Sequence, residues 1–176
     1  MSTMGDTNIE TPLDNWGAVG YVVVWRFQAP SSGNIFDLQL YCNINSGSPV
    51  AYPVIYDDSG GLPNNLVGSG VAQNVPAAFA WLTMPVTGAI IGGNFYHIGF
   101  YIPSTPVLND REAATGTTTM SYLDFAGSIP NPFGVPTGSF ANVGSASIFA
   151  DYTPLATAGG DLAFYPSGGL FLVFPS

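Results

Sequence analysis

The chain has 176 residues, which suits one domain with a sizeable core. Only 7% of the residues are charged, against roughly 25% in typical soluble domains, and two arginines are the only Lys or Arg residues in a chain of net charge −9. So few cations exclude a basic stripe for nucleic acid and a surface for anionic membranes.

The weak charge of the surface favours packing against copies of the same chain or on a larger particle, because neighbouring surfaces repel each other little. The alternative is a monomer kept soluble by its net negative charge. The apolar runs are strand-sized and far shorter than the about 20 residues of a membrane span, so no span is expected. The first residues lack the basic and apolar regions of a secretory signal.

Residues 1–18 are polar at the start and carry Asp6 and Glu10, which predicts an arm or extended entry segment that is disordered or ordered against a neighbouring subunit. The β-branched and aromatic run over 21–28 predicts the first strand, and a turn follows at 30–33. Residues 35–41 alternate strictly, with Ile35, Asp37, Gln39 and Tyr41 on one face, as in a half-buried strand. Further strands are predicted over 50–56, 66–67, 71–72, 80–84, 86–91, 94–102, 120–125, 146–152 and 170–174.

Turn formers dominate 57–65, and loops are predicted over 103–118 and 128–144. The 22 glycines and 15 prolines would interrupt helices of normal length repeatedly. Many short strands separated by turns are typical of a sandwich or barrel. The sequence therefore predicts an all-β protein, with a single antiparallel, jelly-roll-like β-sandwich domain over 19–176.

Catalytic chemistry is not expected. His97 is the only histidine and lies in the middle of a predicted strand, where a local hydrogen bond is the simplest interpretation. Cys42 has no basic neighbour to activate it and has no partner for an internal disulfide.

Asp57 and Asp58, with the amides of Asn64 and Asn65 nearby, have the oxygen ligands that Ca²⁺ prefers. Turn chemistry accounts for them equally well, since Asp and Asn cap turns and Gly60 and Gly61 supply positive φ. No other cofactor is indicated.

Aromatic residues form 14% of the chain. Trp25, Tyr56, Tyr96 and Tyr101 are candidates for an exposed face that stacks on sugar rings. The alternative is that most of these rings fill the core or subunit interfaces. The apolar C-terminal residues Leu170, Phe171 and Phe174 are predicted to form an assembly interface.

Short motifs follow one another along residues 20–153, at 27–30, 33–35, 38–41, 54–63, 81–86, 93–99 and 130–134. This ordered series resembles the choice-of-anchor R type of β-sandwich module, found in bacterial and phage proteins and similar in outline to carbohydrate-binding jelly rolls. The resemblance implies a sandwich that occurs in surface, secreted and tail-associated proteins, without enzyme activity. It also implies a structural aromatic at Trp81, which we therefore assign to the core. His97 departs from the family pattern, which often has Trp at that position.

These observations lead to two hypotheses of different classes. The first is a structural protein of a bacteriophage virion, such as a capsid decoration, head-fibre or tail-associated subunit, located on the particle and partnered by itself and other virion proteins. The second is a secreted or cell-surface carbohydrate-binding module whose partner is a surface glycan.

Overall fold

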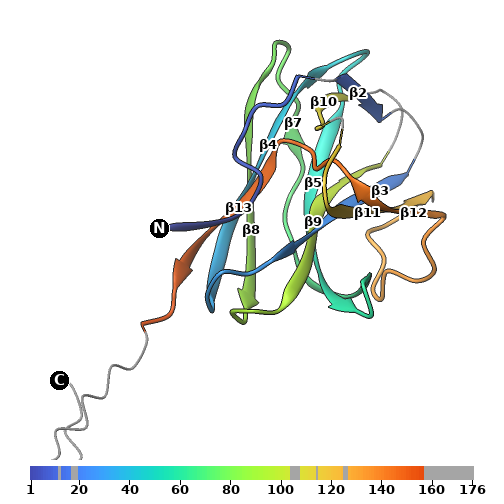
Figure 1. The fold of residues 1–176 in the computed structure, drawn as a ribbon. Coiled ribbons are helices and arrows are strands. Elements are labelled where there is room, and N and C mark those ends of the chain that lie inside the picture. Colours follow the sequence, from blue (N-terminus) through green and yellow to red (C-terminus); the bar gives the residue numbers. More distant parts are fainter. Residues whose placement is uncertain (12, 17–19, 104–107, 114, 125–126, 157–176) are drawn as a thin grey trace, which may run out of the picture.

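The computed structural model describes residues 1–11, 13–16, 20–103, 108–113, 115–124 and 127–156. Its strands form two antiparallel sheets packed face to face (Figure 1), which confirms the predicted antiparallel β-sandwich. The strands are β1 (Ser2–Gly5), β2 (Leu13–Trp16), β3 (Tyr21–Gln28), β4 (Gly33–Ile44), β5 (Val50–Ser59), β6 (Leu62–Ser69), β7 (Gln73–Asn74), β8 (Ala80–Ile90), β9 (Phe95–Ile102), β10 (Leu108–Arg111), β11 (Thr118–Asp124), β12 (Gly138–Val143) and β13 (Ile148–Pro154).

Six strands form one sheet, here named sheet A, in the order β1-β13-β4-β10-β2, with β8 paired to the other side of β4. Seven form sheet B, in the order β12-β11-β3-β9-β5-β6, with β7 also paired to β5. The chain passes repeatedly from one sheet to the other, as the chain of a jelly roll does. The two sheets thereby share one core instead of folding as separate halves.

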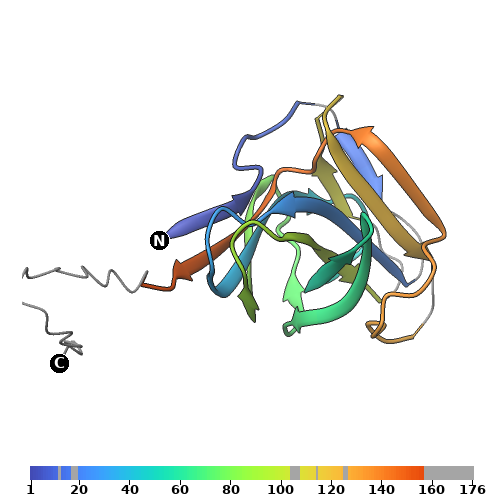
Figure 2. The ribbon, with the colours of Figure 1, turned by 60° about the horizontal axis from the view of Figure 1, so that its bottom comes forward.

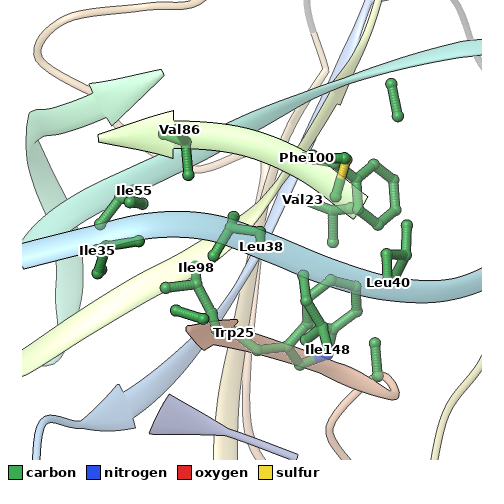
Figure 3. Packing of buried hydrophobic residues seen from close by; sticks show 14 of the residues in the cluster. Val23, Trp25, Ile35, Leu38, Leu40, Ile55, Val86, Ile98, Phe100 and Ile148 are labelled. Carbon is green, nitrogen blue, oxygen red and sulfur yellow. The ribbon is translucent and has the colours of Figure 1, made fainter. Parts of the chain in front are cut away.

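The core lies between the sheets and is filled by alternate residues of both (Figure 3). Leu38 and Leu40 of β4 meet Trp25 of β3 and Phe100 of β9, and all four side chains are fully buried. The period-two pattern of each strand accounts for this arrangement, because successive side chains point to opposite faces of a sheet. The residues between the core positions of sheet A consequently point away from sheet B.

The N-terminal segment belongs to the sandwich and is not a separate arm. Strand β1 pairs with β13, from Ser2 opposite Tyr152 to Gly5 opposite Phe149, and the two strands lie side by side in Figure 2. Strand β2 pairs with β10 at the other end of sheet A. Met4 explains why β1 docks on its own domain, since its side chain is 1% exposed and belongs to the main core.

A second apolar cluster covers the outer face of sheet B. Val22, Val24 and Tyr56 point away from the main core, and the loop that joins β11 to β12 places Phe133 against them. The Tyr56 hydroxyl donates a hydrogen bond to the carbonyl of Pro130 in the same loop. The stretch that the sequence predicts as a loop is therefore a structural cover, here named the sheet B cover (residues 127–137).

Several strands differ from their predicted limits. Strand β8 runs unbroken through Pro85, which lies opposite Asp37 at a bulge in β4. That bulge turns Ile35 into the core, whereas strict alternation placed it with Asp37 on the other face. Strands β6, β10 and β12 lie in or extend into regions predicted as turns or loops. Within the described ranges, no helix is long and apolar enough to cross a membrane.

Candidate functional site

The four aromatic residues predicted to stack on a ligand are all buried, so that prediction is wrong for each of them. Trp25 and Tyr56 have no exposed surface, while Tyr96 and Tyr101 are 5% and 4% exposed. Trp25 and Tyr96 lie in the core between the sheets, and Tyr56 and Tyr101 lie under the sheet B cover. None of these rings can present a face to a sugar.

A different set of four rings gathers on the outer face of sheet A. Tyr41 of β4, Trp81 of β8, Phe149 of β13 and Phe79, which precedes β8, are each half-buried and belong to neither apolar cluster. Tyr41 and Phe149 meet Trp81 in T-shaped contacts, with ring centroids 5.3 and 5.1 Å away, and Phe79 stacks on Tyr41 at 5.6 Å. We name these four residues the aromatic patch; Trp81, assigned to the core from the sequence, is part of it.

A row of polar side chains continues from the aromatic patch along the same strands. The Thr83 hydroxyl donates to Gln39 Oε1 at 2.9 Å, and Gln39 Nε2 donates to Asp37 Oδ1 at 3.4 Å. Asp37 lies directly opposite Asp151 of β13. Burial raises the pKa of the Asp37 carboxyl, and the charge of Asp151 raises it further. We name these four residues the polar row.

The chain between β1 and β2 borders this face. Glu10 donates its backbone N–H to the hydroxyl of Ser147, which precedes β13, and Arg111 of β10 donates to the carbonyl of Thr11. The Arg111 guanidinium also lies over the Phe79 ring, 4.4 Å from its centroid, a cation–π contact. The N-terminal segment and Arg111 thus hold one edge of the aromatic patch in place.

The predicted calcium ligands Asp57 and Asp58 are engaged as hydrogen-bond acceptors. Asp57 accepts from the backbone N–H and the side-chain amide of Asn65, at 2.6 and 3.1 Å. Asp58 accepts from the backbone N–H of Gly61 at 3.2 Å, in a turn where Gly60 and Gly61 both have positive φ. These hydrogen bonds and the positive φ values are those expected of a turn, and no group of three or more His, Cys, Asp or Glu residues placed to hold a metal occurs among the described residues.

Asp58 also joins Arg26 and His97 on the outer face of sheet B. Its Oδ1 lies 2.6 Å from Arg26 Nε and 2.9 Å from His97 Nε2. Burial alone would raise the pKa of Asp58, but the hydrogen bonds from Arg26 and His97 outweigh it and lower the pKa. Burial lowers the pKa of His97 to about 4, so its ring is neutral at pH 7 and Nε2–H donates to Asp58. The predicted local hydrogen bond of His97 is confirmed, and its side chain has no access to solvent.

A pair of carboxyl groups lies at one end of the sandwich. Glu112, which follows β10, accepts a hydrogen bond from Trp25 Nε1 at 3.3 Å and lines a hollow together with Asp14 of β2. Burial and a hydrogen bond with Asp14 raise the pKa of Glu112 to about 7. The hydrogen bond from Trp25, a core residue, places the Glu112 carboxyl group beside the core.

The predicted assembly residues Leu170, Phe171 and Phe174 lie outside the described residues. Comparison with protein-family models, with curated proteins and with solved structures gave no match to this chain. The site is therefore defined by its own geometry: an antiparallel β-sandwich with an aromatic patch and a polar row on one open sheet face.

Proposed function

We propose that this chain is a non-enzymatic structural protein of a bacteriophage virion, such as a capsid decoration, head-fibre or tail-associated subunit. It would act by oligomerising and by docking on the particle through surfaces of low charge. The observation that carries the proposal is the use of both cations of the chain inside its own fold.

Each arginine guanidinium is engaged by its own domain. Arg26 pairs with Asp58 and lies over the Phe95 ring, 3.6 Å from its centroid. Arg111 lies over Phe79 and bonds the N-terminal segment. Because the chain has no other Lys or Arg, contacts with partners would depend on neutral polar, apolar and acidic groups, which suits assembly better than capture steered by positive charge.

The single histidine and the single cysteine of the chain offer little to an enzyme. His97 and Cys42 are fully buried, and burial raises the pKa of the Cys42 thiol, so neither is poised as a base or nucleophile at neutral pH. These features support a role in binding and assembly.

Light scattering coupled to size-exclusion chromatography tests the assembly proposal. We expect a stable oligomer at micromolar concentration, with a mass that is a multiple of 18.4 kDa. Replacing Leu170, Phe171 and Phe174 together by Ser should reduce that mass, whereas Val135→Ser, at a position that is 90% exposed in the sheet B cover, should not. A wild-type chain that stays monomeric, and whose gene lies outside any cluster of head or tail genes, would contradict the proposal.

A further inference from the structure

The outer face of sheet A combines ring surfaces with hydrogen-bonding groups in one plane. In the aromatic patch, Trp81 is held between Tyr41 and Phe149 by contacts at 62° and 66°. A ring fixed in this way loses little conformational freedom when a ligand covers it, so less of the binding energy is lost in ordering the site. Half-buried aromatic rings on a sheet face are suited to the apolar faces of sugar rings.

The polar row lies within reach of the same ligand. Tyr41 and Gln39 are two residues apart on β4, as are Trp81 and Thr83 on β8, and two residues span about 6.8 Å along a strand. Gln39 lies between Phe149 and Thr83 in the strand register, so the row begins directly beside the rings. The hydroxyls of a sugar stacked on the patch would therefore meet amide, hydroxyl and carboxyl groups.

The charges on this face select against acidic partners. Asp37 and Asp151 lie in the polar row, and the whole chain has a net charge of −9. Arg111 is the cation at the patch, and its guanidinium is already stacked on Phe79 and bonded to Thr11. An acidic polysaccharide or a nucleic acid would meet repulsion from the two carboxyl groups, whereas a neutral polyhydroxylated chain would use them as acceptors.

From this geometry we propose that the outer face of sheet A binds a neutral polysaccharide, with Trp81 and its neighbouring rings stacking on sugar rings and the polar row accepting and donating hydrogen bonds to hydroxyls. The inference goes beyond an assembly role and does not depend on it, because it concerns a face formed within one chain. The combination of aromatic rings with uncharged and acidic hydrogen-bond acceptors is what favours a neutral polysaccharide as the ligand.

Native affinity electrophoresis tests the inference, with gels that contain barley β-glucan, galactomannan, xylan or soluble starch, and alginate or polygalacturonate as acidic probes. We expect at least one neutral polysaccharide to retard the wild-type protein, and the acidic probes to leave it unretarded. Trp81→Ala should weaken binding about tenfold or more, as expected for the loss of a stacked ring. Phe140→Ala is the matched control, since Phe140 is 49% exposed on β12 of sheet B, and it should keep wild-type retardation.

A second variant guards against loss of fold in Trp81→Ala. Thr83 is an exposed residue of the polar row, so Thr83→Lys leaves the rings in place while it inserts a long charged side chain at the binding face. It should abolish retardation yet retain the wild-type circular dichroism and melting temperature.

Absence of retardation in all four neutral gels, or equal retardation of wild type and both variants, would overturn the inference. A fall in oligomer mass in Trp81→Ala without polysaccharide binding would also overturn it, and would assign the face to self-association. Light scattering on the same samples keeps this result separate from the assembly proposal, which stands or falls on the wild-type mass.

Discussion

The outer faces of both sheets carry aromatic side chains, but the two faces differ in how far these side chains are buried. On sheet B, the chain folds its own residues 127–137 over the strands, and Tyr56, Tyr101 and Phe133 become a second apolar core. On sheet A, Tyr41 and Trp81 stay half-buried beside the polar row. Among the described residues, the burial of an aromatic side chain on an outer sheet face therefore depends on whether another segment of the chain covers that face.

Removing the main anchor of the sheet B cover should have the largest effect on stability. Phe133 is 1% exposed and packs edge-to-face on Tyr56, with centroids 4.9 Å apart. We expect Phe133→Ala to lower the free energy of unfolding by ~3–5 kcal/mol, as for other buried Phe truncations, measured by urea denaturation. Val135→Ala, in the same loop but 90% exposed, is the control. A cost below about 1 kcal/mol for Phe133→Ala would show that the cover is not a core.

Breaking the charge cluster on sheet B should come next. Asp58→Ala leaves the Arg26 guanidinium and the buried His97 ring without their shared acceptor. We expect the free energy of unfolding, measured by urea denaturation, to fall by ~2–3 kcal/mol. The reason is that removing one member of a partly buried ion pair leaves its partners without a hydrogen-bond acceptor. Asp57→Ala, which removes an exposed turn cap, should cost clearly less. Equal costs for the two variants would contradict the distinct role of Asp58.

On sheet A, Trp81→Ala should cost only ~1–2 kcal/mol, because it removes two T-shaped contacts and half-buried surface. Measured beside Phe133→Ala, it is the direct test of the comparison between the faces. If Trp81→Ala is as costly as Phe133→Ala, the aromatic patch is part of the structural core and the open-face interpretation fails.

The smallest expected effect is a pH dependence at the pair of carboxyl groups, Glu112 and Asp14, at one end of the sandwich. The pKa of Glu112 is raised from 4.5 to about 7 in the fold, so the folded state keeps a proton that the unfolded chain has already lost between these values. The contribution of Glu112 to stability should therefore be full below pH 4.5, fall as pH rises towards 7, and level off above it. Discounted for the partial exposure of Glu112, the fall should be about 1 kcal/mol, or ~2–4 °C in Tm.

Thermal denaturation between pH 4.5 and 8 measures this effect. Glu112→Gln keeps an acceptor for Trp25 but cannot titrate, so its melting temperature should lose this downward slope. Glu10→Gln changes the same charge on the N-terminal segment and should retain the slope. A wild-type slope that persists in Glu112→Gln would assign it to another group.

The strands of the sandwich could be predicted from the local sequence pattern. Whether the outer face of each sheet is covered or exposed could not. Alternation over 35–41 correctly placed Asp37, Gln39 and Tyr41 on one face, so three residues of the candidate site were predicted to point the same way. The partnership of Tyr41 with Trp81 and Phe149 depends on strand register across more than 100 residues of chain, which no local pattern encodes.

The four buried aromatic residues, in contrast, are cases in which the sequence did not reveal burial. Tyr56 and Tyr101 lie on an outer face of sheet B, and their burial follows from the loop at 127–137, which has the composition of a turn-rich linker. Trp81 was assigned to the core because the resemblance to choice-of-anchor R modules implies a structural aromatic at its position, yet its position on β8 alternates with the core residues Met84 and Val86. The alternation of β8 was the available signal, and the proline at position 85 obscured it by splitting one strand into two predicted ones.

The pairing of β1 with β13 also has a mechanical consequence. Ser2 lies opposite Tyr152, so the start of the first strand and the end of the last described strand lie at the same end of a two-strand ladder. Ladder hydrogen bonds in an antiparallel pair run perpendicular to the strands. A pulling force applied between these two points would therefore act along the bonds and open them one after another, so that β1 would peel away before the sandwich itself yields.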